Sequence, residues 1–247
     1  MSEKKIVLAG NPNVGKSTIF NKLTGLNQHT GNWPGKTVDY ACGSYKYNGE
    51  KYLIYDLPGT YSLNAHSSEE EISSEFICFG NYDVVVIVVD AINMERNLNL
   101  VLQILEVTNK AVLCINLMDQ AKSRKIKIDL EEMAKILKIP VVGTSAGKQR
   151  KLTDLLKKIH DVDNFVDRFK IDYDSFIEEN IKKIEKNLKI KRWMAIRILM
   201  GDEFFVENLI KNYNLDEQLV YEQIKNVKIS LLDQGINKNS LNDYIVK

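Results

Sequence analysis

Short hydrophobic runs alternate with amphipathic segments over the first two thirds of the chain. Uninterrupted apolar runs are typical of strands buried in a parallel sheet, and apolar positions three or four residues apart are typical of helices. The strands expected on this basis are 6–9, 84–89, 111–115 and 141–142. Segments 38–47 and 51–56 alternate around Asn48-Gly49, which favours a two-residue hairpin turn. The helices expected between the strands are 16–24, 68–79, 95–108, 129–137 and 151–160.

This order of elements predicts an α/β fold with a mostly parallel, six-stranded sheet covered by helices on both faces. After about residue 165, Lys, Glu, Asn, Ile and Leu dominate the sequence and strand-like runs nearly vanish. Helical spacing is then found in segments 172–188, 193–200, 202–212, 216–229 and 237–245. We therefore expect two domains: an α/β domain over residues 1–165 and a small all-helical domain over residues 166–247.

The first expected strand runs into a glycine-rich loop, and a helical pattern follows the loop. The residues are Gly10-Asn11-Pro12-Asn13-Val14-Gly15-Lys16-Ser17-Thr18. They match G-x-x-x-x-G-K-[ST], in which successive backbone N–H groups surround a phosphate at a helix N-terminus. Lys16 is expected to reach the β- and γ-phosphates, and the Ser17 hydroxyl to bind Mg²⁺. A chance glycine turn would not account for the flanking strand and helix, so residues 11–18 are expected to contact a nucleotide.

Two further segments have the features of groups that sense the γ-phosphate. Asp56-Leu57-Pro58-Gly59 ends the second hairpin strand, where Asp56 is expected to hold Mg²⁺ through water and the Gly59 N–H to contact the γ-phosphate. Thr37 is the candidate switch threonine, whose hydroxyl would complete the Mg²⁺ shell only with the γ-phosphate present. Thr60 follows Gly59, where Ras-type GTPases have the glutamine that orients the attacking water. Thr37, Gly59 and Thr60 are the candidate catalytic residues, although we do not expect Thr60 to position the water itself, and we predict slow hydrolysis.

Two more motifs point to guanine as the base. Asn116-Leu117-Met118-Asp119 follows the strand expected at 111–115, and the Asp119 carboxylate can accept both the N1–H and N2–H of guanine. Adenine offers no matching pair of donors, so this residue favours GTP over ATP. Ser145-Ala146-Gly147 follows the last expected strand, where a backbone N–H could contact the guanine O6. Five motifs in this order predict a P-loop GTPase fold.

Composition excludes several other classes of protein. The chain is 44% hydrophobic and 27% charged with a formal net charge of +1, which gives no support for nucleic acid as the main partner. Three widely spaced cysteines match neither a zinc site nor a disulfide framework and are typical of a reducing cytosol. We expect no signal peptide, and no run approaches the ~18 apolar residues of a membrane span. The basic run at 182–192 is interpreted as a solvated helix face in preference to an interaction patch.

Together these motifs resemble the N-terminal cytosolic region of the ferrous iron transport protein B (FeoB) family. The most specific are Gly31-Asn32-Trp33-Pro34-Gly35-x-Thr37-Val38 and Asp56-Leu57-Pro58-Gly59-Thr60-Tyr61-Ser62-Leu63. Others are Asp90-Ala91-x-Asn93-x-Glu95-Arg96-Asn97-Leu98, Asn116-x-Met118-Asp119 and Arg192-Trp193-x-Ala195-Ile196-Arg197-Ile198-Leu199-x-Gly201-Asp202-Glu203. The resemblance covers nearly the whole chain. We interpret Arg96 as a helix-surface residue and not as an arginine finger.

The resemblance implies a G domain followed by a helical, GDI-like domain that stabilises the GDP-bound state. In the full-length protein a membrane domain carrying the Fe²⁺ pathway would follow, which places this soluble region at the cytoplasmic face of the cell membrane. It also implies small accessory Feo proteins and a homo-oligomer as candidate partners, and K⁺ bound through Asn13 as an activator, which would add positive charge beside the phosphates. Asn13 as a simple turn residue stays an alternative.

Two residues depart from the family pattern. Lys36 stands where a small apolar residue is usual and is interpreted as facing solvent, with a phosphate contact as the alternative. His66 stands where an aromatic residue is common, and a single histidine without a Cys, His or clustered carboxylate partner is a poor metal site. We assign no metal role to it, to His29 in the switch region or to His160 on a helix near the domain boundary.

Two other functions stay open. One is an Era-like GTPase associated with RNA, although the helical tail shows no Gly-x-x-Gly loop. The other is a nucleotide-binding interaction module without meaningful catalysis, which Thr60 in place of glutamine keeps in consideration.

Overall fold

The computed structural model describes residues 3–25, 28–32, 39–64, 67–145, 150–165 and 167–235. The chain divides into two compact units, Met1–Lys170 and Ile171–Lys247. The expected division between residues 165 and 166 lies five residues before this limit. Each unit is described by itself.

The first unit is built on one sheet with the strand order β2-β3-β4-β1-β5-β6-β7. Its strands are β1 (Glu3–Gly10), β2 (Gln28–Asn32), β3 (Asp39–Tyr47), β4 (Glu50–Asp56), β5 (Val84–Asp90), β6 (Ala111–Asn116) and β7 (Val141–Gly143). β4, β1, β5, β6 and β7 run parallel, whereas β2 and β3 are antiparallel to their neighbours. The parallel strands therefore place their carboxyl ends at one edge, where the expected motifs follow them.

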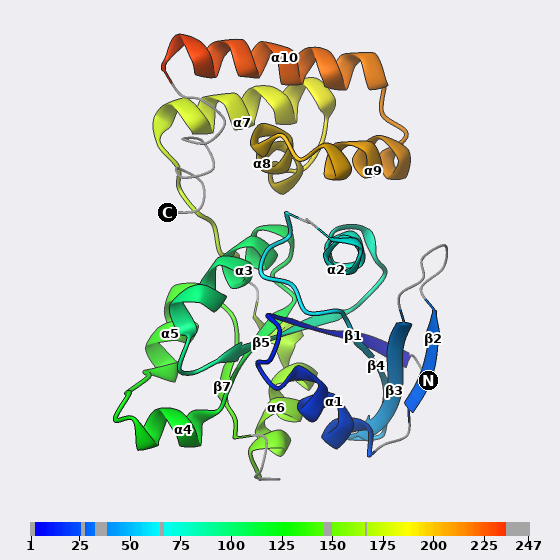
Figure 1. Cartoon of the computed structure of the whole chain (residues 1–247), viewed down its shortest axis with the longest axis vertical. Helices are drawn as coiled ribbons and strands as arrows, with labels where there is room; N and C mark the ends of the chain where they lie inside the picture. The colour runs from blue at the N-terminus through cyan, green and yellow to red at the C-terminus, as the bar shows by residue number, and fades with distance from the viewer. Residues whose placement is uncertain are drawn as a thin grey trace. The chain divides into compact units, whose positions relative to one another are not determined.

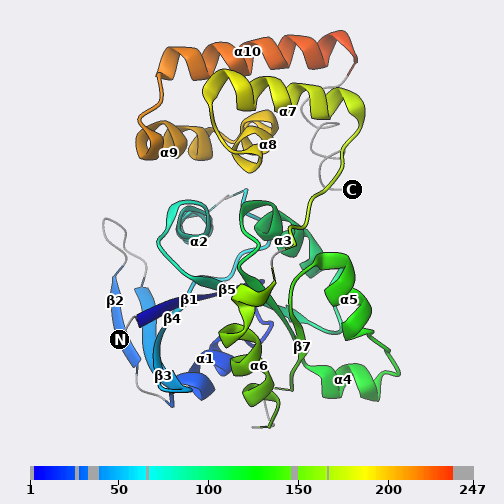
Figure 2. The same cartoon turned by 180° about the vertical axis from the view of Figure 1, so that it is seen from behind.

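Helices cover both faces of this sheet, as Figures 1 and 2 show from opposite sides. α1 (Lys16–Thr24) and α6 (Arg150–His160) lie on one face, and α2 (Ser68–Phe79) and α3 (Met94–Val107) lie side by side on the other. α4 (Met118–Ser123) and α5 (Leu130–Leu137) lie toward β7, and a short 3-10 helix, η1 (Val162–Asn164), follows α6. Alternate strand residues such as Ile6, Leu8 and Ile54 are fully buried in the core with Ile19 and Phe20 of α1.

The second unit is helical throughout its described part. It consists of α7 (Ser175–Leu188), α8 (Arg192–Met200), α9 (Glu203–Tyr213) and α10 (Glu217–Asp233). Asp174, Asp202 and Asp216 each cap a helix by accepting a backbone N–H three residues on. Arg197 forms a buried ion pair with Asp202 at 2.5 Å, which joins α8 to the start of α9.

These elements confirm the predicted fold class and differ from the prediction in detail. The sheet has seven strands where six were expected, because β2 pairs with β3 along the outer edge. The sequence of β2, Gln-His-Thr-Gly-Asn, has no alternation of apolar residues to signal it. α4 was also not predicted, since it has only six residues and one buried side chain. The helix expected at 237–245 lies outside the described residues.

Candidate functional site

The glycine loop turns from β1 into α1 at the carboxyl edge of the sheet. β1 ends at Gly10, and Gly15 caps α1 with a φ of 85°, in the left-handed region that favours glycine. A Cβ at Gly10 would lie 2.3 Å from the Val88 carbonyl oxygen, and one at Gly15 would lie 2.3 Å from the Asn116 side-chain nitrogen. Neither position has room for another residue. The chain therefore forms the strand–loop–helix arrangement that the motif requires.

The residues expected at the phosphates and Mg²⁺ meet one another on the next strand. Lys16 Nζ bonds the Asp56 carboxylate and donates to the Leu57 carbonyl oxygen at 2.5 Å, and Ser17 Oγ donates to Asp56 Oδ2 at 2.9 Å. The Lys16 and Asp56 side chains are each 10% exposed. A carboxylate beside a hydroxyl is a donor set that suits Mg²⁺, which prefers oxygen ligands. In this arrangement the three side chains satisfy each other.

The segment after Asp56 packs directly on the glycine loop. The Thr60 N–H donates to the Gly10 carbonyl at 3.1 Å, and a Cβ at Gly59 would lie 3.1 Å from backbone atoms of Pro12. Gly59 therefore lies against the glycine loop. The expected contact between its N–H and a γ-phosphate requires this position. Thr60 is fully buried, and its hydroxyl donates to the Ser62 carbonyl at 2.5 Å. The Thr60 hydroxyl is thus used within its own turn.

The residues expected at the base lie at the carboxyl ends of β6 and β7. Asn116 is fully buried, and its amide nitrogen donates to the Val14 carbonyl at 2.9 Å, which ties β6 to the glycine loop. The Thr144 hydroxyl donates to Asn116 Oδ1 at 3.2 Å. Asp119 is exposed, and its backbone N–H donates to Ser145 Oγ at 3.2 Å. The Met118 N–H donates to the Thr144 carbonyl, so the two motifs are held together by three links.

Other predicted site residues are placed less informatively. Thr37, Ala146 and Gly147 lie outside the described residues, as do Lys36 and His66. Asn13 is exposed with a φ of 66°, and Thr18 is exposed on α1. Val14 is 3% exposed and belongs to the core.

Asn11 has an unusual environment for a buried polar residue. It is 3% exposed, yet neither atom of its side-chain amide has a hydrogen-bond partner among the described residues. Buried amides are almost always paired. The Asn11 amide would therefore stabilise a water or a bound group placed beside it.

Sequence reasoning missed the contacts that hold segment 58–63. The Ser73 and Ser74 hydroxyls of α2 donate to the carbonyls of Pro58 and Leu63, each at 2.7 Å. On α3, the Gln103 side chain contacts the same segment. Arg96 is exposed, as expected, but its guanidinium also lies 4.2 Å from the centre of the Tyr61 ring. No local motif marks these contacts.

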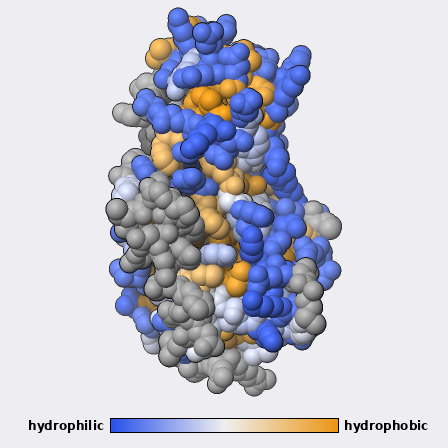
Figure 3. Space-filling view, turned by 90° about the vertical axis from the view of Figure 1, so that its right-hand side faces the viewer, coloured by the Kyte–Doolittle hydropathy of each residue, from blue (hydrophilic) through white to orange (hydrophobic). Residues whose placement is uncertain are grey.

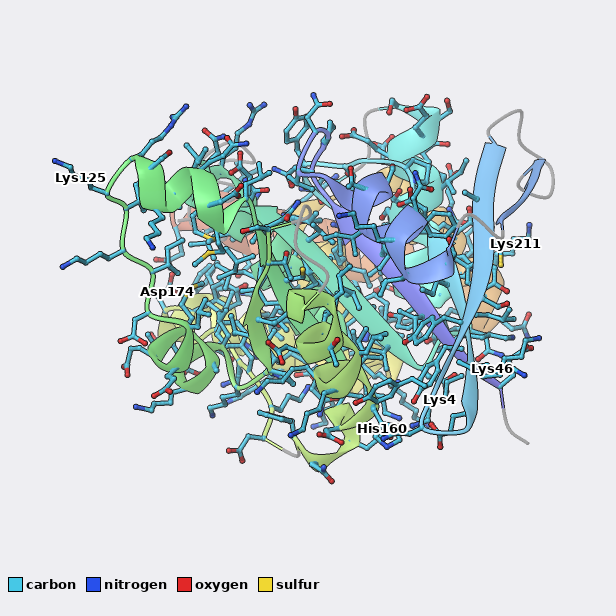
Figure 4. The ribbon with its side chains drawn as sticks, turned by 90° about the horizontal axis from the view of Figure 1, so that it is seen from below. Lys4, Lys46, Lys125, His160, Asp174 and Lys211 are labelled. Atoms are coloured by element: carbon cyan, nitrogen blue, oxygen red, sulfur yellow. The ribbon has the colours of Figure 1, made fainter. Side chains whose placement is uncertain are left out.

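A second polar cluster lies at the opposite edge of the sheet, where Figure 4 shows Lys4 and His160 close together. Tyr52 Oη is 2.7 Å from Glu50 Oε2 and 2.8 Å from His160 Nδ1. The hydrogen bond from Tyr52 lowers the pKa of Glu50, and burial raises the pKa of Tyr52. This cluster joins the β3–β4 hairpin to the end of α6 and is remote from the glycine loop. No group of three or more His, Cys, Asp or Glu suited to a metal occurs within the part of the chain that the structure describes.

The glycine loop between β1 and α1, with the Asn-x-x-Asp motif after β6, defines a P-loop protein with the G-domain fold of GTPases. The family model described as Ferrous iron transport protein B matches residues 4–159, which is more than half of the chain. The chain belongs to this family.

Relatives and solved structures agree with this assignment. The Fe(2+) transporter FeoB of Methanocaldococcus jannaschii is 43% identical over 242 residues, covering 95% of this chain and 35% of that protein. An S. thermophilus NFeoB N11A mutant bound to mGDP has a TM-score of 0.86 at 31% identity, covering 99% of this chain and 96% of that one. The cytosolic domain of the T. maritima FeoB iron transporter in a GDP form has a TM-score of 0.78 at 36% identity, covering 92% and 98%.

The chain spans only about a third of its curated relatives, 35% of the M. jannaschii protein. Within the described ranges, no helix has both the length and the apolar character needed to cross a membrane. Hydrophilic residues predominate on the coloured part of the helical unit in the face shown in Figure 3.

Proposed function

We propose that this chain is the GTP-binding and slowly GTP-hydrolysing regulatory part of a prokaryotic Fe²⁺ transporter. In this proposal it changes conformation with its nucleotide and so gates or drives ferrous iron uptake through a membrane domain that is not in this sequence. The observation that carries the proposal is the arrangement of Asp119, which is exposed beside Ser145 while Asn116 ties its strand to the glycine loop. GDP-bound relatives with the same fold support it.

The base would be recognised by the Asp119 carboxylate. Two guanine donors facing two carboxylate oxygens make a charge-assisted, bidentate pair. Adenine would leave the carboxylate unpaired at this place, which is a costly mismatch. The N–H groups of residues 145–147 would contact the guanine O6, and residues 11–18 would surround the phosphates.

Hydrolysis would depend on groups that contact the γ-phosphate. Lys16 would exchange Asp56 and the Leu57 carbonyl for phosphate oxygens, and Ser17 and Thr37 would then hold Mg²⁺ with Asp56 acting through a water. When bound, Mg²⁺ neutralises charge that develops on the phosphates. The Gly59 N–H would contact the γ-phosphate, and K⁺ held by Asn13 would supply positive charge where no arginine finger is available.

Nucleotide state would be transmitted by two segments. Residues 31–37 and 59–68 would be ordered with GTP and released after hydrolysis. The helical unit would act as a GDI-like domain that favours the GDP-bound state and passes the change to the membrane domain. In the full-length protein the chain would therefore lie at the cytoplasmic face of the cell membrane, with accessory Feo proteins or further copies as candidate partners.

The test is multiple-turnover phosphate release with Mg²⁺ in matched KCl and NaCl, for the wild type and Asn13→Ala. We expect slow turnover that is faster in K⁺ and loses this difference in the variant. Asn81→Ala, an exposed residue before β5, is the control and should keep the wild-type salt response. Equal slow rates in both salts would remove the role of K⁺ and Asn13. No turnover above buffer in either salt would leave a nucleotide-binding module and contradict the enzymatic part of the proposal.

A further inference from the structure

α3 holds the segment that follows Gly59 through a row of polar side chains. Arg96, Asn99 and Gln103 are spaced three and four residues apart and therefore share one face of the helix. The Arg96 guanidinium stacks on the Tyr61 ring at 4.2 Å, and Gln103 reaches Ser62 and Leu63. α2 and α3 lie side by side in both Figures 1 and 2, and the segment is hydrogen-bonded to both of them.

Gln103 forms the central contact. Its Oε1 accepts the Leu63 N–H at 2.6 Å and the Ser62 hydroxyl at 3.1 Å. Its Nε2 donates to Asn99 Oδ1 at 3.3 Å. The amide orientation follows from this network, because Oε1 faces two donors and Nε2 faces an acceptor. Asn99 thereby keeps Oε1 directed at the segment.

The opposite side of the segment is fixed by α2. Ser73 bonds the Pro58 carbonyl and Ser74 bonds the Leu63 carbonyl. The segment is therefore held near both ends, and Gly59 and Thr60 between them lie against the glycine loop. Since the Thr60 hydroxyl is bonded to the Ser62 carbonyl, the part of this stretch left to face a γ-phosphate and its water is backbone.

We infer that Gln103 and Arg96 are positioning residues for GTP hydrolysis. They hold the backbone of 59–61 in place, so that Gly59 presents a fixed N–H group at the γ-phosphate while the Thr60 N–H ties the segment to the Gly10 carbonyl. Rigid placement of backbone donors replaces the side chain that a conventional glutamine would supply, since fixed dipoles need no reorganisation during the reaction. Gln103 is expected to contribute more to this positioning than Arg96, because the exposed cation–π contact of Arg96 with Tyr61 contributes little free energy. This inference rests on the proposed GTPase activity and adds the residues that make the site rigid.

The first test separates turnover from nucleotide affinity. Gln103→Met keeps the length of the side chain and removes the acceptor, so we expect kcat to fall about 10-fold from the lost hydrogen bonds. GDP has no γ-phosphate, so its Kd should stay within about twofold. Gln103→Glu restores an acceptor and should recover kcat to within about threefold of wild type. Gln218→Met, on exposed α10 surface, is the matched control with unchanged kcat.

The outcomes distinguish this inference from the proposed function. A wild type without turnover overturns the proposed function, and the catalytic part of the inference falls with it. A wild type that turns over while Gln103→Met does the same at an equal rate overturns the inference alone. Equal losses of kcat in Gln103→Met and Gln103→Glu would also overturn it, because a packing role would not discriminate between them.

Hydrogen exchange gives a readout that is independent of activity. The Leu63 amide bonds Gln103, so Gln103→Met should speed its exchange about tenfold while the β1 amides are unchanged. Arg96→Met should give a smaller increase, and Tyr61→Phe, which keeps the ring, should give none. Unchanged exchange at Leu63 in Gln103→Met would overturn the positioning role.

Discussion

The two sides of the candidate site differ in how their polar groups are satisfied. On the glycine-loop side, Lys16, Ser17 and Asp56 bond one another, and the Lys16 and Asp56 side chains are 10% exposed. On the other side, Asp119 is exposed, and the structure records no partner for its carboxylate among the described residues. In the proposed function the first side would have to exchange partners to bind phosphate, whereas Asp119 on the second side is already exposed where the base would bind.

This difference indicates where nucleotide binding costs free energy. Separating Lys16 from Asp56 removes a charge-assisted contact in a poorly solvated place, which phosphate and Mg²⁺ would have to replace on both residues. Presenting Asp119 requires no such exchange, because its helix is already held by Ser145 and Thr144. Three experiments would test this comparison, from the largest expected effect to the smallest, and a fourth would test the packing of β6, the strand that ends at Asn116.

Removing the Lys16 charge should have the largest effect. In Lys16→Met the phosphates lose their ammonium partner and Asp56 is left as an unpaired anion, so we expect GDP affinity to fall more than about 100-fold. Titration with a fluorescent GDP analogue measures this. Lys22→Met, exposed in the last turn of the same helix, is the control. Affinity within threefold of wild type would show that the Lys16–Asp56 contact is not exchanged on binding.

Changing Asp119 should alter which base is bound. In Asp119→Asn, one donor faces a guanine donor, so we expect about 100-fold weaker GTP binding and a gain for xanthosine nucleotides, which carry a carbonyl there. Asp154→Asn, exposed on α6, should bind both like wild type. Competition between the two nucleotides gives the ratio. An unchanged preference for guanine would remove Asp119 from the base site.

Asn116 links the two sides of the candidate site, so its removal should lower the stability of the unit that contains them. Asn116→Ala removes the bonds to Val14 and Thr144 in a fully buried place, so we expect the free energy of unfolding of the first unit to fall by about 2 kcal/mol. Denaturant unfolding measures this, with Asn81→Ala as an exposed control. If the free energy of unfolding of Asn116→Ala equals that of Asn81→Ala, the two sides are not coupled through Asn116.

Cysteine labelling should give the smallest signal. Burial raises the pKa of the Cys114 thiol to about 12, so it stays protonated and unreactive near pH 8, whereas the half-buried Cys42 should be alkylated first. Because the folded pKa is the higher one, the unfolded chain releases this proton first, and stability falls as pH rises from 9.0 toward about 12. Mass spectrometry of the native protein follows the labelling. Equal rates at both cysteines would indicate that β6 and β7 open readily.

Local signals predicted much of the fold. The bounds of α1 and α2 agree with the predicted segments, because a glycine loop and a capping Ser67 mark their starts. Asn48 and Gly49 both have positive φ, as the hairpin turn requires. β2 has no comparable signal, since pairing along an open edge depends on β3 and not on its own residues.

The candidate site likewise combines features with a local sequence signal and features without one. Motif residues such as Lys16, Asp56 and Asp119 could be proposed from the sequence because their chemistry is concentrated in short runs. The contact from Asn116 to Val14 spans 102 positions, and the one from Gln103 to Leu63 spans 40. Such contacts follow from the packing of strands and helices, and a single sequence contains no periodicity that reports them. The Asn11 amide, which has no partner among the described residues, likewise becomes visible only once the loop is folded.

One feature at the far edge of the sheet has a mechanical consequence. Asp163 in η1 forms ion pairs with Lys4 of β1 at 3.6 Å and with Lys110, just before β6, at 3.5 Å. η1 ends six residues before the limit of the first unit at Lys170. A force on the chain beyond η1 would therefore be transmitted through these two ion pairs to β1 and to the residue before β6, and not to α6 alone. Because Asp163 and Lys110 are exposed, this attachment should weaken as the salt concentration rises.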